Sequence, residues 1–217
     1  MDQNNGEKHL KPILCYPGGK SRLAVGFLDF FPKHDRFVEP FAGGASVLFA
    51  KKPVKQEIIN DADPLVANFY RNFKKSPDSV KKCDMTASGR RFARLKPRVK
   101  SDKPNLSVCD TLYMNKRSYG CKWNVFSKKK NNSSNRKSTG LKHIIDNIDD
   151  YKKRMKHVKV LNKDYEEVIK NHDSPNTFFY LDPPYLTHHD VYRKGFDTRD
   201  FDHERLANVI RDIRGKW

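Results

Sequence analysis

Four short, β-prone runs stand out in the pattern of hydrophobic and polar residues, and a helical pattern follows the first three. They cover residues 36–40, 57–60, 158–162 and 177–181. Such runs, rich in β-branched and aromatic residues, predict strands. Each of the first three leads through a turn into a stretch with helical spacing, which is typical of βαβ units and a parallel sheet. The fourth run, TFFYL, is almost entirely apolar, as expected for a strand covered on both faces.

Helix-start signals agree with this alternation. Asp63 stands directly before a proline, which offers a cap followed by proline at the first helical position. Asp164 precedes another helical pattern in a similar way. A last helix is predicted within 202–214, beginning near Asp202 or His203, because its apolar residues recur at helical spacing.

The stretch from about 86 to 147 breaks the alternation. No acidic residue occurs from Thr111 to Ile145, where nine lysines and arginines are interleaved with aromatic residues. Residues 127–140 are too polar to pack and predict a mobile loop. We interpret this stretch as an inserted subdomain that contacts a polyanion.

Length and charge narrow the function classes. A chain of 217 residues suits one sizeable α/β domain or a core with a smaller insert. The formal net charge of +18 favours nucleic acid as a partner first and an anionic membrane surface second, with a merely solvated basic surface as the third interpretation. No apolar run reaches membrane-spanning length, and the N-terminus has no signal-peptide core, so no membrane partner is predicted.

The four cysteines and eight histidines give no metal or redox motif. No two cysteines have C-x-x-C spacing, so an intracellular protein with reduced thiols is expected. His188 and His189 have no further ligand at a helpful spacing, so no metal site is predicted.

Two glycine-rich turns are candidates for a close approach of the backbone to a ligand. Residues 38–46, VEPFAGGAS, end a strand and start a helix, as nucleotide-binding loops do, although an ordinary turn explains this motif alone just as well. Asp61 lies 18 residues after Gly43, where nucleotide folds place a ribose-binding carboxylate, whereas Asp63 fits better as a cap. Residues 15–23, CYPGGKSRL, look like a phosphate cradle but lack the Walker A pattern, so a flexible helix start stays an alternative.

The order of these pieces is recognisable. YPGGK, EPFAGGAS, NDAD, the basic insert and DPPY follow one another over nearly the whole chain. This order resembles that of the Dam-type, alpha-group DNA adenine N6-methyltransferases. The resemblance implies an α/β, Rossmann-like, S-adenosylmethionine-dependent methyltransferase fold with a mainly parallel sheet and an inserted, largely helical DNA-recognition subdomain. It also implies a cofactor-binding part at 1–85, a basic target-recognition insert at 86–147 and a catalytic part at 148–217.

The resemblance further implies three groups of site residues. The cofactor, S-adenosyl-L-methionine, is expected to be bound by Tyr16, Gly18, Gly19, Lys20, Glu39, Phe41, Gly43, Asp61 and Asp182. Residues 112–126 resemble the family's recognition segment, and the DNA-binding candidates there are Asn115, Lys116, Arg117, Tyr119 and Lys122. Tyr119 would either fill a gap in the base stack or belong to the core of the insert, two equal alternatives. The catalytic residues are expected to be Asp182, Pro183, Pro184 and Tyr185.

The DPPY motif suits transfer of a methyl group to adenine. The exocyclic amine of adenine is a poor nucleophile because its lone pair is delocalised into the ring. Asp182 and the Pro183 carbonyl would accept the hydrogens of this amine, and the two prolines hold that backbone rigid. Tyr185 offers a ring on which the base stacks. The adenine must leave the duplex, at a cost of roughly a few kcal/mol, and no metal is needed.

The predicted function is therefore site-specific methylation of double-stranded DNA at adenine N6. The enzyme would act in the cytoplasm or nucleoid, or in the host cytoplasm if a phage or virus encodes it, and a restriction endonuclease partner would suit it. One alternative is an RNA or protein amide N-methyltransferase, since such motifs serve planar amines generally. The other is a DNA-binding protein with an incomplete catalytic domain, because residues 215–217, GKW, look like the start of a strand after which the family continues with further sheet.

Overall fold

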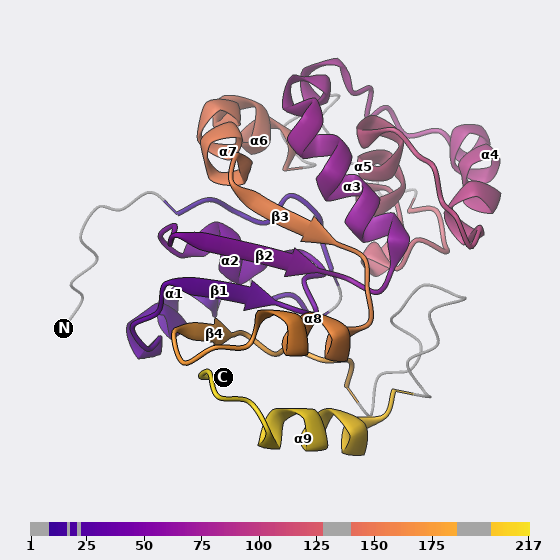
Figure 1. The fold of residues 1–217 in the computed structure, drawn as a ribbon. Helices are drawn as coiled ribbons and strands as arrows, with labels where there is room; N and C mark the ends of the chain where they lie inside the picture. Colours follow the sequence, from indigo (N-terminus) through magenta and orange to yellow (C-terminus); the bar gives the residue numbers. More distant parts are fainter. Residues whose placement is uncertain (1–8, 17, 21–22, 128–139, 186–200) are drawn as a thin grey trace.

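Strands and helices alternate along the chain (Figure 1). The structure is a computed structural model and describes residues 9–16, 18–20, 23–127, 140–185 and 201–217. The strands are β1 (Arg36–Glu39), β2 (Gln56–Asn60), β3 (Val158–Leu161) and β4 (Thr177–Phe179). The α-helices are α1 (Ala24–Phe27), α2 (Ser46–Ala50), α3 (Pro64–Lys75), α4 (Gly89–Lys100), α5 (Val108–Lys116), α6 (Leu141–Asp146), α7 (Ile148–Met155), α8 (Tyr165–His172) and α9 (His203–Arg211). Within these ranges, no helix is long and apolar enough to cross a membrane.

The four strands form one parallel sheet in the order β3-β2-β1-β4, which confirms the predicted strands and their direction. Val38 of the central strand β1 pairs with Ile58 on one side and with Phe179 on the other. The last residues of the chain extend the sheet, because Lys216 makes a parallel bridge with Phe178. Residues 215–217 therefore lie beside β4, as expected for the start of a further strand.

Alternate residues of each strand face opposite sides of the sheet, and helices cover both sides. Phe37 and Phe178 belong to the larger core, which includes apolar residues of α1, α2, α3, α7 and the insert. Their neighbours Val38 and Phe179 belong to a second cluster with α8 and α9. In Figure 1, α8 lies at the height of β4 with α9 below it, and α3, α5 and α7 lie above β3. Strand β4 is buried along its whole length, as its apolar sequence predicts, β1 and β2 are buried except at their first residues, and the edge strand β3 is partly exposed.

The predicted helix starts are confirmed by their caps. Asp63 accepts a hydrogen bond from the Leu65 N–H at 2.8 Å and begins α3. Asp164 caps α8 through Glu166 N at 2.9 Å. Asp202 caps α9 in the same manner, so the last helix begins at His203, as expected. Each cap satisfies an amide that would otherwise lack a partner at the helix end.

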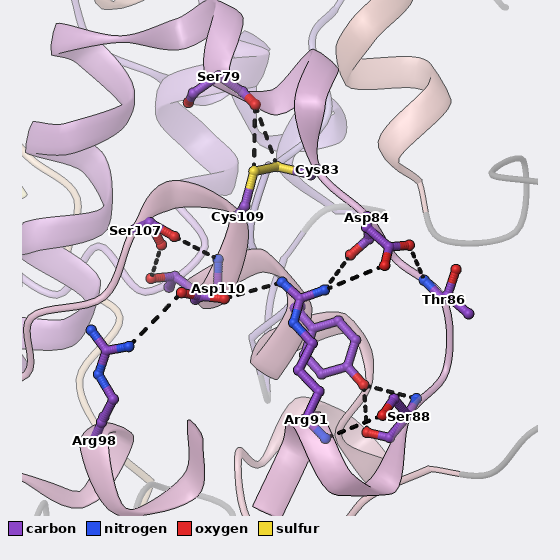
Figure 2. A network of polar contacts seen from close by, with 12 residues as sticks. Ser79, Cys83, Asp84, Thr86, Ser88, Arg91, Arg98, Ser107, Cys109 and Asp110 are labelled. Carbon is purple, nitrogen blue, oxygen red and sulfur yellow. Dashed lines mark hydrogen bonds and ion pairs between the residues drawn. A yellow bond between two sulfur atoms is a disulfide. The ribbon is translucent and has the colours of Figure 1, made fainter. Parts of the chain in front are cut away.

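The insert is helical, as predicted, and a polar network fixes α4 against α5. Arg91 binds Asp110 at 3.0 Å, stacks over the Tyr113 ring at 4.1 Å from its centre, and contacts Asp84 (Figure 2). Arg98 lies on the other side of Asp110, with the two charged groups 4.0 Å apart. Apolar residues of these helices belong to the same core as α3. The insert is therefore packed onto the sheet domain instead of having a separate core.

The expectation of reduced thiols is wrong in this structure, because the four cysteines form two disulfides. Cys83 and Cys109 link the segment before α4 to α5, and both sulfurs lie near the Ser79 carbonyl (Figure 2). Cys15 and Cys121, 106 residues apart, link the first glycine-rich turn to the insert. Spacing along the chain could not indicate these pairs, because folding brings their members together from distant positions.

Candidate active site

A cavity of about 340 Å³ lies at the carboxyl ends of the strands. This is the edge where open α/β sheets bind ligands, at the point where connections leave adjacent strands in opposite directions. All the predicted cofactor-binding and catalytic residues except Gly18 line the cavity. Gly18 lies beside it, since a Cβ on this residue would stand 2.9 Å from the Tyr185 ring. The fold thus brings residues from both ends of the chain to one place.

The loop after β1 is shaped by a glycine with left-handed backbone geometry. Gly43 has φ +47°, and a Cβ there would lie 2.8 Å from the Tyr16 ring. Asp61 holds this loop, because one of its carboxylate oxygens accepts the Gly43 N–H at 2.8 Å. Its other oxygen accepts the Asp63 N–H, also at 2.8 Å. Asp61 therefore joins the glycine loop to the start of α3, a role that the spacing argument did not anticipate.

The DPPY motif meets the first glycine-rich turn through Lys20. The Lys20 ammonium donates to both carboxylate oxygens of Asp182, at 2.8 and 2.9 Å, and to the Tyr185 hydroxyl. Tyr185 in turn donates to Asp182 at 2.9 Å. Partial burial disfavours the charged amine, but the hydrogen bonds and charge of Asp182 outweigh it and raise the pKa of Lys20. Asp182 therefore accepts hydrogens from a nitrogen in this structure, which is the action expected of it toward an amine.

Glu39, at the end of β1, is a buried carboxyl with one unsatisfied oxygen. Its side chain is 3% exposed, and it accepts a hydrogen bond from the Leu48 N–H. Among the described residues, none hydrogen-bonds to its Oε2 atom. Burial raises the pKa of Glu39 to about 8, and the nearby Asp182 charge adds to this. A cation entering the cavity would satisfy this carboxylate.

An aromatic group in the lining of the cavity was missed by the sequence reasoning. The rings of Phe41, Tyr165 and Phe201 lie with their centres 5.3 to 5.7 Å apart. Arg205 stands over Tyr165, 5.0 Å from the ring centre, and binds Asp164 at 2.7 Å. In the sequence, nothing distinguishes Tyr165 and Phe201 from ordinary helix or loop residues. The one available signal was the position of Tyr165 next to the cap Asp164, just after a strand.

The five predicted DNA-binding residues fall into two groups. Asn115 is fully buried, and Arg117 donates to the Met85 carbonyl at 2.8 Å, so both are engaged inside the protein. Tyr119 is 65% exposed, which excludes the alternative that it belongs to the core of the insert. Lys122 lies on the same turn. Lys116 is partly buried, and burial lowers its pKa to about 8.

Among the described residues, no group of three or more histidine, cysteine or acidic side chains could hold a metal ion. His188, His189 and most of the predicted mobile loop at 127–140 lie outside the described residues.

Known proteins are similar to this sequence over most of its length. The family model for D12 class N6 adenine-specific DNA methyltransferase matches residues 16–216. The chain is 26% identical to the type II methyltransferase M.MjaIII of Methanocaldococcus jannaschii, over 94% of this chain and 80% of that protein. It is 24% identical to M.CviBI of Paramecium bursaria Chlorella virus NC1A, over 95% and 81% of the two chains. For M1.LlaDCHI of Lactococcus lactis subsp. cremoris the identity is 26%, over 82% and 66%.

Proposed function

Because the chain belongs to the D12 class of N6 adenine-specific DNA methyltransferases, we propose that its cavity binds S-adenosylmethionine beside a flipped adenine. The observation that carries this proposal is the meeting of Asp182 and Tyr185 with the two glycine-rich turns at one edge of the sheet. The DNA substrate follows from the family, whereas the roles of the individual residues are our own inference.

The cavity fits this cofactor by the groups it presents. The unpartnered Glu39 oxygen suits the ammonium of the methionine part. Asp61, at the end of β2, suits the ribose hydroxyls, because a carboxylate accepts hydrogen bonds and this one lines the cavity beside the glycine loop. The rings of Phe41, Tyr165 and Phe201 suit the flat adenine of the cofactor.

Asp182 and Pro183 orient the target amine. Bound S-adenosylmethionine supplies an electrophilic methyl group on a positively charged sulfur. Asp182 accepts one hydrogen of the adenine amine, and the Pro183 carbonyl accepts the other, which turns the nitrogen lone pair out of conjugation with the ring. Tyr185 stacks on the base. In the structure, the Lys20 ammonium donates to Asp182. The adenine amine would replace this ammonium as the hydrogen-bond donor to the carboxylate.

The insert offers an exposed surface for the phosphates of DNA. Arg90 and Arg94 lie one helical turn apart on α4, both exposed, and within the described part of the chain neither side chain makes a hydrogen bond or ion pair. Helix α4 carries no acidic residue and packs through Phe92 on Phe126, at the end of the predicted recognition segment. Figure 1 shows α4 toward the end of the molecule to which the strands point. We assign phosphate contacts to these arginines and the gap left by the flipped base to Tyr119.

The biological setting follows from the substrate and from the relatives. The relatives are type II methyltransferases, so we propose a modification role alongside a restriction endonuclease. The enzyme would work inside a cell, where DNA is found. In a reducing compartment both disulfides would open to thiols. Cys83 and Cys109 could then donate to the Ser79 carbonyl, from which their sulfurs lie 3.6 and 3.4 Å away.

Transfer of tritiated methyl groups tests this function. The chain should label adenine in unmethylated duplex DNA, and it should label neither RNA nor protein. Asp182→Ala should lower the rate at least about a hundredfold, the scale for losing a positioned catalytic group, while the folded state persists. Equal labelling by Asp182→Ala would remove Asp182 from the mechanism. A chain that binds DNA but labels no substrate would instead be a binding module.

A further inference from the structure

Asn115 makes two opposite hydrogen bonds to one distant residue. It lies near the end of α5 with a side chain that is 0% exposed. Its amide nitrogen donates to the Cys15 carbonyl at 2.7 Å, and its amide oxygen accepts the Cys15 N–H at 2.9 Å. The two bonds imitate the pairing of a strand and bridge 100 residues of sequence. Of the uncharged side chains, only asparagine and glutamine carry such a donor and acceptor side by side.

The segment held by Asn115 shapes the cofactor cavity. Cys15 directly precedes Tyr16, whose carbonyl accepts the Gly19 N–H at 3.0 Å. The Tyr16 ring lies on Gly43, so closely that a Cβ there would stand 2.8 Å from it. A shift of Cys15 would therefore move the ring that lines the cavity and the turn that carries Lys20.

The other side of Asn115 belongs to the exposed turn of the insert. The Asn115 carbonyl accepts the Ser118 hydroxyl at 3.0 Å, and Ser118 pairs with Phe126 in an antiparallel bridge. This bridge closes the turn on which Tyr119 is exposed. The disulfide from Cys121 to Cys15 spans the same two segments. Asn115 and the disulfide are thus two parallel clasps between the DNA-facing turn and the cofactor turn.

We infer that Asn115 is a positioning residue, which holds the Tyr16 turn in its cofactor-binding geometry from within the target-recognition insert. This rests on the proposed function for its effect on the cofactor, but not for the clasp itself. When the disulfide is reduced, the two hydrogen bonds of Asn115 still join these segments. Its loss should then matter most, because two groups that restrain one residue are not additive.

Kinetics of Asn115→Ala provide the first test, with Asn68→Ala as a matched control. Asn68 also joins the main domain to the insert by an amide-to-carbonyl bond, to Pro104 at 3.1 Å, but it does not touch the Tyr16 turn. Loss of two buried bonds should raise the KM for S-adenosylmethionine about tenfold in Asn115→Ala, with kcat nearly unchanged. Asn68→Ala should leave this KM within about twofold. Equal changes in both variants, or none in Asn115→Ala, would overturn the inference.

Cys121→Ser distinguishes the two clasps without touching the Cys83–Cys109 pair. This variant alone should change the KM by less than about threefold, and in its background Asn115→Ala should cost more than in the disulfide-bonded protein. A strictly additive result would show that the clasps do not restrain the same segment and would contradict the proposal.

Hydrogen exchange gives a readout that needs no cofactor. In Asn115→Ala the amides of Cys15 and Gly19 should exchange faster, whereas those in α3 should keep their protection. If the wild-type chain fails to bind S-adenosylmethionine, the proposed function fails, and exchange still decides on the clasp. Unchanged exchange at Cys15 would show that Asn115 does not hold this segment.

Discussion

Cofactor binding should release a proton from Glu39. A pKa of about 8 leaves roughly nine-tenths of this carboxyl protonated at pH 7. If its free oxygen receives the ammonium of S-adenosylmethionine, the charged form becomes favoured and the pKa falls toward its ordinary value. At pH 7 we therefore expect release of about 0.8 to 0.9 proton for each cofactor bound.

The same titration should make affinity depend on pH. Each pH unit below the pKa costs about 1.36 kcal/mol, so the Kd should rise about tenfold between pH 7 and pH 6. The Kd should be measured at or below pH 7. The α-amino group of the cofactor would lose its own charge at higher pH, since a free α-amino group has a pKa of roughly 7.7 to 8.0.

Titration calorimetry in buffers of different ionisation enthalpy measures the released proton directly. The apparent binding enthalpy of the wild-type chain should vary between phosphate and Tris, and that of Glu39→Gln should not. Methylthioadenosine, which lacks the amino acid part of the cofactor, should bind the wild-type chain without proton release. Identical enthalpies for the intact cofactor in all buffers would refute the assignment of Glu39 to the ammonium.

Further predictions concern stability, the ribose contact and the DNA surface. Because the folded pKa of Glu39 lies near 8, above its value of 4.5 when unfolded, the free energy of unfolding should fall as pH rises from 4.5 to 8, and less steeply in Glu39→Gln; urea denaturation measures this. Asp61→Ala should weaken cofactor binding about ten- to a hundredfold by calorimetry, whereas Asp63→Asn, which keeps a cap, should not; equal effects would contradict the ribose role. Replacing Arg90 and Arg94 by glutamine should make the slope of log K for DNA binding against log salt concentration shallower by about 1.8. Replacing Lys152 and Lys153 at the end of α7 by glutamine should leave this slope unchanged. An unchanged slope in the arginine variant would mean that α4 makes no phosphate contacts.

The sequence was informative wherever a local pattern has one physical cause. Short apolar runs predicted all four strands, and acidic residues before helical patterns predicted the starts of α3, α8 and α9. The order of motifs predicted the family, which the match across residues 16–216 bears out at the level of the D12 class. The finer Dam-type assignment stays a prediction. Because the carboxyl ends of parallel strands meet at one edge, residues such as Asp61 and Asp182 could be placed in one site from the sequence alone.

What the sequence could not show depends on contacts between distant segments. Asn115 lies in a stretch that resembles a recognition segment, yet its side-chain amide is buried and hydrogen-bonds to the backbone of Cys15. The two disulfides could not be predicted either, because each joins cysteines that are distant along the chain. Tyr165 and Phe201 become a ring-binding surface only when α8 and α9 cover the same face of the sheet. No local pattern distinguishes these residues from ordinary core or surface positions.

Two buried glutamates on neighbouring strands, Glu57 and Glu39, differ in whether the protein provides hydrogen-bond partners for both of their carboxylate oxygens. Glu57 of β2 is 6% exposed and is fully engaged, with Lys51 at 2.7 Å and Arg154 bonded to both of its oxygens. Glu39 of β1 is 3% exposed, yet one of its oxygens has no partner among the described residues. A buried oxygen without a hydrogen-bond partner costs free energy, and a buried charge costs more, which is why burial keeps the Glu39 carboxyl mostly protonated at pH 7. A cation that enters the cavity would favour the charged form and bind the free oxygen, and we therefore assign Glu39 to ligand binding and Glu57 to the framework.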